Sequence, residues 1–169
     1  MKQKAAKGQT LIELLIATAI FALIISPFVS SLANLTFAQV RYRHQIQAAQ
    51  YAREALEIAY NIIINLEDTQ AWDTFVADYA DNGQVYHPTL TEPLSLMTGI
   101  ELPIAGKFSR QIAFEKARRD NDTLDIDKNG AIIDSNTLKI TVTVNWNDQG
   151  KTQDVKIFTY LINFKLTDI

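Results

Sequence analysis

The sequence predicts an α+β protein in which one long N-terminal helix packs on a small antiparallel β-sheet. Three patterns predict this fold class. Leu14–Ala38 is an apolar run without a charged residue, apolar side chains then recur every three or four positions between Tyr42 and Ile63, and Leu138–Asn147 alternates strictly between apolar and polar residues. Because helices repeat about every 3.6 residues and strands every 2, the first two patterns indicate helix and the third a half-buried strand.

The apolar run Leu14–Ala38 has the dimensions of a membrane-spanning helix. Its roughly 25 residues would rise about 37 Å, and about 20 residues are enough to cross the hydrocarbon core. The run is longer than the apolar region of a cleavable secretory signal, and no clear signal-peptidase site follows it. Lys2, Lys4 and Lys7 precede the run, which predicts a cytoplasmic N-terminus and a body outside the cytoplasm. Two arginines just beyond the run oppose this orientation.

The helical pattern continues beyond the predicted membrane span. An apolar stripe runs along one side of the chain, and its members are Tyr42, Ile46, Ala49, Ala52 or Arg53, Leu56, Ala59 or Tyr60, and Ile63. We therefore expect one helix from about Thr10 to Leu66, whose second half packs on the rest of the protein. A second, short helix is expected within Asp68–Gly83, where an Asn-Gly pair would end it.

The remaining residues are expected to form loops and strands. Gln84–Gly106 contains three prolines and two glycines, which predicts a loop with short extended pieces. Strands are expected at Phe108–Phe114, Leu138–Asn147 and Val155–Ile162, the last two joined by a turn rich in Asn, Asp and Gly. Three antiparallel strands packed on the apolar helix stripe would complete the core.

Composition and charge exclude several classes of function. The 169 residues include no cysteine, which excludes disulfide frameworks, thiolate zinc sites and cysteine catalysis. The formal net charge is −3, and an acidic body does not favour nucleic-acid binding, which needs clustered Lys and Arg. His44 and His87 are isolated, and the sequence has no nucleophile elbow, Walker loop or dinucleotide fingerprint. We expect no catalytic residues and no nucleic-acid partner.

Glu13 lies at the start of the apolar run, and two interpretations of it are open. A carboxylate close to the lipid interface can reach water and needs no function. A carboxylate inside hydrocarbon costs several kcal/mol and usually marks a functional partner. The residues that surround Glu13 favour the second interpretation.

A short stretch before the apolar run, Lys7–Glu13 (KGQTLIE), resembles the processing site of type IV pilins and type II secretion pseudopilins. That site has a short basic leader, a glycine, and an apolar stretch with glutamate as the fifth residue after the glycine. The resemblance implies cleavage after Gly8 by a prepilin peptidase in the membrane, followed by N-methylation of the new terminus at Gln9. The chain departs from the family at Gln9, where phenylalanine is preferred. This departure bears on methylation more than on cleavage, which depends mainly on the glycine.

The same resemblance implies roles for Glu13 and Pro27. In a filament of packed helices, Glu13 of one subunit would face the Gln9 amine of a neighbour and set the axial register, because a lone buried carboxylate is costly and a paired one is compensated. Pro27 removes a helical hydrogen bond. It marks either the helix break of pilins, where the helix can stretch in the filament, or a simple kink in a membrane helix.

These predictions divide the chain into four segments. Residues 1–8 would be a prepilin leader, 9–38 a transmembrane and filament-core helix, 39–66 the amphipathic half of the same helix, and 67–169 a C-terminal α+β head. A long N-terminal helix half-buried in its own domain is also the fold that the resemblance to pilins implies.

A loop between the first two predicted strands contains part of a calcium-site motif. Asp125–Gly130 (DIDKNG) fits the opening of the calcium-loop pattern, in which alternate oxygens converge and a glycine permits the sharp turn. Asp125, Asp127 and Asn129 would be ligands, and Asp134 would replace the usual closing glutamate, because an asparagine stands at that position. The alternative is an acidic hairpin loop, since turns use the same residue types. Calcium is the one cofactor that the sequence suggests, and none is required.

The predicted function is structural. We expect a subunit, and more specifically a minor pilin, of a type IV pilus or related filament assembled through its N-terminal helix. The expected partners are other pilin subunits, the prepilin peptidase, an inner-membrane assembly platform and, before assembly, membrane lipid. The expected location is the cytoplasmic membrane, single-pass with the N-terminus inside, and then a cell-surface filament. The alternatives are a type II secretion pseudopilin and an uncleaved, signal-anchored binding domain outside the cytoplasm.

Overall fold

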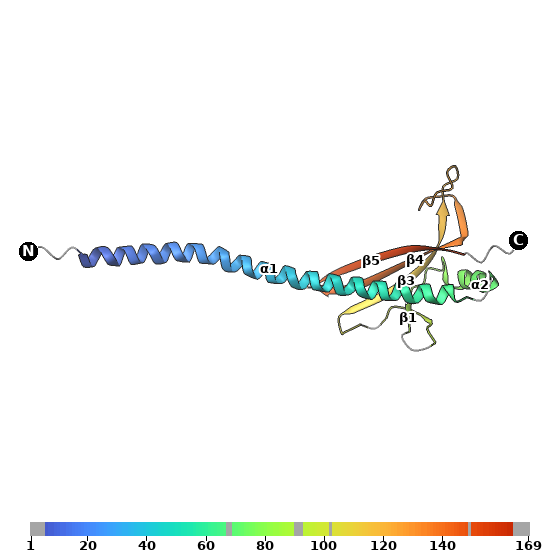
Figure 1. The fold of residues 1–169 in the computed structure, drawn as a ribbon, viewed down its shortest axis with the longest axis horizontal. Coiled ribbons are helices and arrows are strands. Elements are labelled where there is room, and N and C mark those ends of the chain that lie inside the picture. Colours follow the sequence, from blue (N-terminus) through green and yellow to red (C-terminus); the bar gives the residue numbers. More distant parts are fainter. Residues whose placement is uncertain (1–5, 67–68, 90–92, 102, 149, 164–169) are drawn as a thin grey trace, which may run out of the picture. The chain divides into compact units, whose positions relative to one another are not determined.

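The structure, a computed structural model, describes residues 6–66, 69–89, 93–101, 103–148 and 150–163. Its elements in chain order are α1 (Ala6–Ile64), α2 (Thr69–Tyr79), β1 (Tyr86–Pro88), β2 (Leu96–Thr98), β3 (Phe108–Arg119), β4 (Ile132–Asp148) and β5 (Lys151–Ile162) (Figure 1). The chain forms two compact units, Met1–His44 and Gln45–Ile169. We call the second the head unit. The predicted α+β fold, a long helix packed on an antiparallel sheet, is confirmed.

The sheet of the head unit is antiparallel throughout and has the strand order β2-β1-β3-β4-β5. The three predicted strands are present as β3, β4 and β5. The short extended pieces predicted within Gln84–Gly106 are present as β1 and β2, which join the sheet beside the three predicted strands. Each of these two strands has 3 residues, which is too short for a period-2 pattern to stand out from the surrounding loop.

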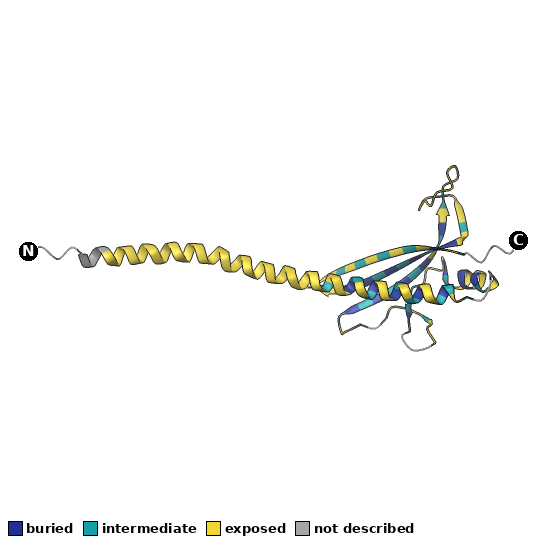
Figure 2. Ribbon diagram, viewed as in Figure 1, coloured by how far each residue is buried: buried dark blue, intermediate teal, exposed yellow. Residues whose placement is uncertain are grey.

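The side chains of α1 that face the sheet differ from the predicted stripe. Within the head unit, α1 packs through a row of small residues, of which Ala48, Ala52, Ala55 and Ala59 are fully buried. Two large members of the predicted stripe, Tyr42 and Ile46, are 64% and 43% exposed. The prediction was wrong for these two positions because small side chains let a helix approach a surface closely, whereas large ones hold it away. These four alanines are part of the buried face of α1 within the head unit, which Figure 2 shows in dark blue.

The three long strands show the expected alternation of burial. Inward-facing β4 side chains, from Leu138 to Trp146, are buried at every second position, and β5 has one sheltered face and one exposed face. The register of β3 against β4 shifts between Lys116 and Ala117. A bulge of this kind bends a strand pair. Beyond it, the ends of β3 and β4 continue as a hairpin arm, Ala117–Asn136 (Figure 1).

The short helix α2 closes one end of the core. Trp72, Phe75 and Val76 are buried, as its sequence pattern predicts. The indole Nε1–H of Trp72 donates to the carbonyl oxygen of Ser135 at 3.0 Å, which ties α2 to β4. Asn82 donates from its side chain to the Asp78 carbonyl at 2.7 Å and so satisfies one of the free carbonyls at the end of α2.

Candidate functional site: the N-terminal helix and the hairpin arm

The N-terminal part of α1 exposes its whole surface. All side chains from residue 10 to residue 43 are exposed, including large apolar ones such as Phe21, Leu23 and Phe28 at 64%, 75% and 63% (Figure 2). Among the described residues, this is one helix long and apolar enough to cross a membrane, judged by length and composition. At about 25 cal/mol per Å², an uncovered apolar helix is costly in water. Lipid or other helices therefore have to cover this part of α1.

The predicted processing and assembly residues all lie on this part of α1. Gly8 and Gln9 fall in its first helical turns, and Glu13 follows about one turn later. The Glu13 side chain is exposed, and no ion pair joins it to another described residue. The structure places these three residues in sequence along one helix. The cleavage and pairing roles predicted for them stay predictions.

Pro27 lies inside α1, and the helix continues through it. The missing N–H of proline deprives the carbonyl one turn earlier, that of Leu23, of its usual donor. Nearby hydroxyl groups are satisfied within the helix: Ser30 donates to the Ser26 carbonyl at 3.0 Å, and Thr36 donates to the Leu32 carbonyl at 3.0 Å. Such bonds make hydroxyl side chains compatible with lipid or with packed helices. The proposed opening of the helix at Pro27 in a filament stays a prediction.

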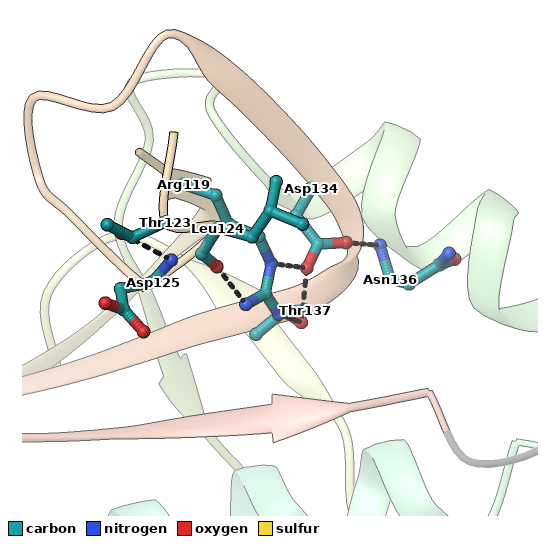
Figure 3. A network of polar contacts seen from close by, with 7 residues as sticks. All are labelled: Arg119, Thr123, Leu124, Asp125, Asp134, Asn136 and Thr137. Atoms are coloured by element: carbon teal, nitrogen blue, oxygen red, sulfur yellow. Dashed lines mark hydrogen bonds and ion pairs between the residues drawn. The ribbon is translucent and has the colours of Figure 1, made fainter. Parts of the chain in front are cut away.

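The hairpin arm is organised around Arg119. Its guanidinium donates from Nε to Asp134 Oδ2 at 2.7 Å and from Nη1 to the Leu124 carbonyl at 2.9 Å (Figure 3). Thr137 donates its hydroxyl to the same Asp134 oxygen at 2.7 Å, and the backbone N–H of Asn136 donates to Asp134 Oδ1 at 2.9 Å. One carboxylate therefore accepts hydrogen bonds from three groups and faces one cation. The residue pattern did not predict this pairing, which joins residues on opposite strands of the arm.

The calcium ligands predicted in the arm are not brought together. Asp134 is occupied by Arg119 and Thr137, whereas Asp127 accepts the backbone N–H of Asn129 at 2.9 Å in a local turn. Across the described residues, no three carboxylate or histidine side chains form a group that could hold a metal ion. The residues as placed fit the alternative, an acidic hairpin loop, better than a calcium loop. Calcium binding stays a prediction, which calorimetric titration of the full chain with CaCl₂ would test.

Gly130 has a role that the calcium motif did not predict. The motif uses glycine for a sharp turn, but the backbone of Gly130 is not in the left-handed region. A Cβ atom at this position would collide with the carbonyl group of Arg119 and would lie 2.8 Å from its backbone nitrogen. The glycine is needed because the two backbone segments of the arm touch here.

Replacing Gly130 with alanine is therefore expected to destabilise the head unit by about 1–3 kcal/mol, since the neighbour is backbone and cannot turn aside. Urea unfolding followed by tryptophan fluorescence measures this, because both tryptophans of the chain, Trp72 and Trp146, are buried in the head. Gly150→Ala is the control. Gly150 has a φ of 79° and open space around it, so this change should cost only the left-handed backbone strain of about 1–2 kcal/mol. Equal stability of wild type and Gly130→Ala would contradict the close approach.

The Arg119 network makes the stability of the arm depend on pH. Partial burial raises the pKa of Asp134, but the hydrogen bonds from Thr137, Arg119 and the Asn136 N–H, with the charge of Arg119, outweigh it and lower that pKa below its ordinary value. A carboxyl whose pKa is lowered by folding stabilises the fold above its unfolded pKa, about 3.9. That contribution is lost as the pH falls through the lower folded pKa.

We expect Asp134→Asn to be less stable than wild type at pH 7, with the difference shrinking as the pH is lowered below about 4. Urea unfolding at a series of pH values measures both proteins. Asp154→Asn, at an exposed position of β5, controls for the removal of one negative charge. A difference that stays constant from pH 7 to pH 3 would contradict the ion pair with Arg119.

A second charged cluster ties α1 to the sheet. Arg110 lies on the inward face of β3 and is only 1% exposed. Its Nε and Nη2 bind the two carboxylate oxygens of Glu101, the latter at 3.3 Å, while Nη1 lies 3.4 Å from Glu54 Oε1 and donates to the Tyr51 carbonyl at 3.4 Å. Glu54, on α1, therefore faces the buried guanidinium while its own side chain stays 46% exposed.

These observations define a class of protein: an α+β head whose helix extends into an apolar, uncovered N-terminal segment. Residues 3–29 match the prokaryotic N-terminal methylation motif. No curated protein sequence and no solved structure gives a significant match to the chain. The match confirms the predicted recognition at the N-terminus: residues 3–29 carry the signature of type IV pilins and pseudopilins.

Proposed function

We propose that the chain is a structural subunit, more specifically a minor pilin, of a type IV pilus or related filament. One observation carries the proposal: from residue 6 onward the methylation motif lies on a helix whose side chains from residue 10 to residue 43 are all exposed and mostly apolar. Such a helix suits lipid before assembly and neighbouring helices after it. No enzymatic activity is proposed.

The proposed maturation begins in the cytoplasmic membrane with the N-terminus inside. The prepilin peptidase hydrolyses the peptide bond after Gly8, which releases the leader as a carboxylate and leaves an ammonium group on Gln9. Methylation of that amine keeps its positive charge. An inner-membrane assembly platform then moves the subunit from the membrane into the filament, with the head outside.

Glu13 and Gln9 are proposed to act as the register device of assembly. Within one helix the two residues are about one turn apart, so a neighbour displaced along the helix axis can present its Gln9 amine to Glu13. At any other offset both charges stay unpaired among apolar side chains, and each unpaired charge costs several kcal/mol. Correct assembly is therefore selected by the penalty on wrong offsets.

The mature N-terminus tests the proposal. Intact-mass analysis of the protein from its native membrane is expected to show loss of Met1–Gly8, with one added methyl group on Gln9. Gly8→Val should retain the leader, whereas Ala6→Val, the control, changes a nearby leader residue and should still be processed. If wild-type protein retains Met1–Gly8, the filament proposal fails and the uncleaved membrane-anchored binding domain takes its place. A processed subunit found with a type II secretion system would identify a pseudopilin.

A further inference from the structure

A hollow of about 340 Å³ lies at β3, where residues of β4, β5 and the hairpin arm also line it. The edge of β3 is covered at two places. Ala80 pairs with Phe114 on one side, and the Asp127 N–H donates to the Arg118 carbonyl at 2.9 Å on the other. The hollow lies between these two contacts. We call it the basic hollow; its lining includes the cations Lys116, Arg118, Lys128 and Lys139, the carboxylates Asp81, Glu115 and Asp127, and the ring of Tyr160.

Three cations of the basic hollow have no carboxylate partner. Within the part of the chain that the structure describes, the side chains of Lys116, Arg118 and Lys128 make no ion pair. Other basic residues of the same strands differ. Arg110 and Arg119 of β3 are each paired with a carboxylate. Lys139 of β4, the fourth cation that lines the hollow, is also paired, because its Nζ lies 2.7 Å from Glu115, another lining residue. Three of the four lining cations are therefore without a carboxylate partner among the described residues.

The carboxylates of the hollow do not neutralise these cations. Asp81 accepts the backbone N–H of Lys116 at 3.3 Å, and Asp127 accepts the backbone N–H of Asn129 at 2.9 Å. Each retains lone pairs that can accept further hydrogen bonds. Glu115, the third carboxylate of the lining, is paired with Lys139. The hollow thus combines free cationic donors with acceptors, on a chain whose formal net charge is −3.

The mixture of groups identifies a class of ligand. A guanidinium binds a carboxylate with two parallel hydrogen bonds, which suits Arg118. Carboxylate acceptors at Asp81 and Asp127 suit hydroxyl groups, and the ring of Tyr160 offers an apolar face with a polar end. The volume is at the lower end of the range for small-molecule pockets, about 300–1,000 Å³. We propose that the basic hollow binds an acidic sugar, with its carboxylate on Arg118 and its hydroxyls on the two aspartates.

Calorimetric titration of the full chain tests the proposal, at low ionic strength and in a detergent without a sugar headgroup. The probes are glucuronic acid and galacturonic acid, with glucose and acetate as the neutral sugar and the bare carboxylate. At least one acidic sugar is expected to bind at least tenfold more tightly than either glucose or acetate. Arg118→Ala should weaken that binding at least tenfold. Arg53→Ala removes an exposed arginine of α1 outside the hollow and should leave binding unchanged.

Each outcome bears on the proposal. Arg118 is exposed, so Arg118→Ala is expected to unfold at the same urea concentration as wild type, and loss of binding in a folded variant supports the site. Equal binding of acetate would identify a simple anion site and overturn the sugar. Equal binding of glucose, no binding of either acidic sugar, or binding unaffected by Arg118→Ala would each overturn the proposal. None of these outcomes depends on leader cleavage or filament assembly.

Discussion

Replacing Arg110 with methionine is expected to lower the free energy of unfolding of the head unit by about 2–4 kcal/mol. The guanidinium is 1% exposed, and Glu101, which binds it through both carboxylate oxygens, is 17% exposed. Without Arg110, the Glu101 carboxylate would be left largely out of water and without the guanidinium that binds both of its oxygens. Removing one partner of a buried ion pair costs about 3–5 kcal/mol. We expect somewhat less here, because Glu54, the second carboxylate, is 46% exposed and can turn to solvent.

Urea unfolding followed by the fluorescence of Trp72 and Trp146 measures this change. Lys139→Met is the matched control: it removes a cation paired with Glu115 at 2.7 Å, but this pair is 31% and 51% exposed. An exposed pair contributes about 0–1 kcal/mol, so the control should unfold close to wild type. The double variant Arg110→Met, Glu101→Gln should recover part of the lost stability, since the Glu101 carboxylate is then no longer left without a positive partner. If Arg110→Met and Lys139→Met are equally stable, the cluster does not stabilise the head.

Sequence periodicity predicted the strands in which apolar and polar residues alternate. β4 alternates apolar and polar side chains over its inward half, and the structure buries every second residue there, from Leu138 to Trp146. In β3, Arg110 stands at every-second-position spacing between Phe108 and Ile112, and all three side chains are buried on one face. Periodicity could assign a face to this arginine. It could not supply the partners, because Glu54 and Glu101 come from a helix and a loop that only the folded chain brings to it.

The contact between α1 and the sheet shows why the buried face of the helix could be predicted only in part. Ala52 and Ala59 were named as alternatives in the predicted stripe, whereas Ala48 and Ala55 were not, although all four are fully buried. Alanine is a good helix former at exposed and buried positions alike. A row of alanines therefore carries a weak signal beside larger apolar residues. Which face of α1 is buried depends on how closely the helix can approach the sheet, and a single sequence does not contain that information.

The hairpin arm shows the limit of a motif. DIDKNG has the residues of a calcium loop, yet Asp134 pairs with Arg119 across the arm and Gly130 is fixed by a backbone contact. Both contacts follow from the register shift between Lys116 and Ala117, which moves the partner strand by several residues. A bulge leaves no periodic pattern in the sequence, so the sequence does not predict which side chains the bulge brings together.

The apolar surface of α1 and the position of Glu13 lead to one argument about assembly. A carboxylate on a helix that lipid or other helices must cover requires compensation, and no other described residue pairs with it. Interface water could serve in the membrane, before assembly. In a bundle of packed helices water is excluded, so the partner has to come from another subunit. The proposed Gln9 amine, created by cleavage after Gly8, has the required charge and the required position on a displaced neighbour.

Glu13→Ala is therefore expected to reduce incorporation into filaments at least tenfold while leader cleavage continues. The variant leaves the neighbour's ammonium without a counter-charge in an apolar bundle, and a penalty of about 3–5 kcal/mol corresponds to more than a hundredfold in an equilibrium. The ratio of subunit in sheared filaments to subunit in membranes measures incorporation, and intact mass of the membrane fraction measures cleavage. Glu57→Ala, which removes an exposed glutamate from the head part of the same helix, should incorporate normally. Glu13→Asp keeps the charge on a shorter side chain and should lie between the two. Normal incorporation of Glu13→Ala would contradict the register hypothesis. A defect accompanied by a retained leader would also contradict it, because the glutamate would then act in processing.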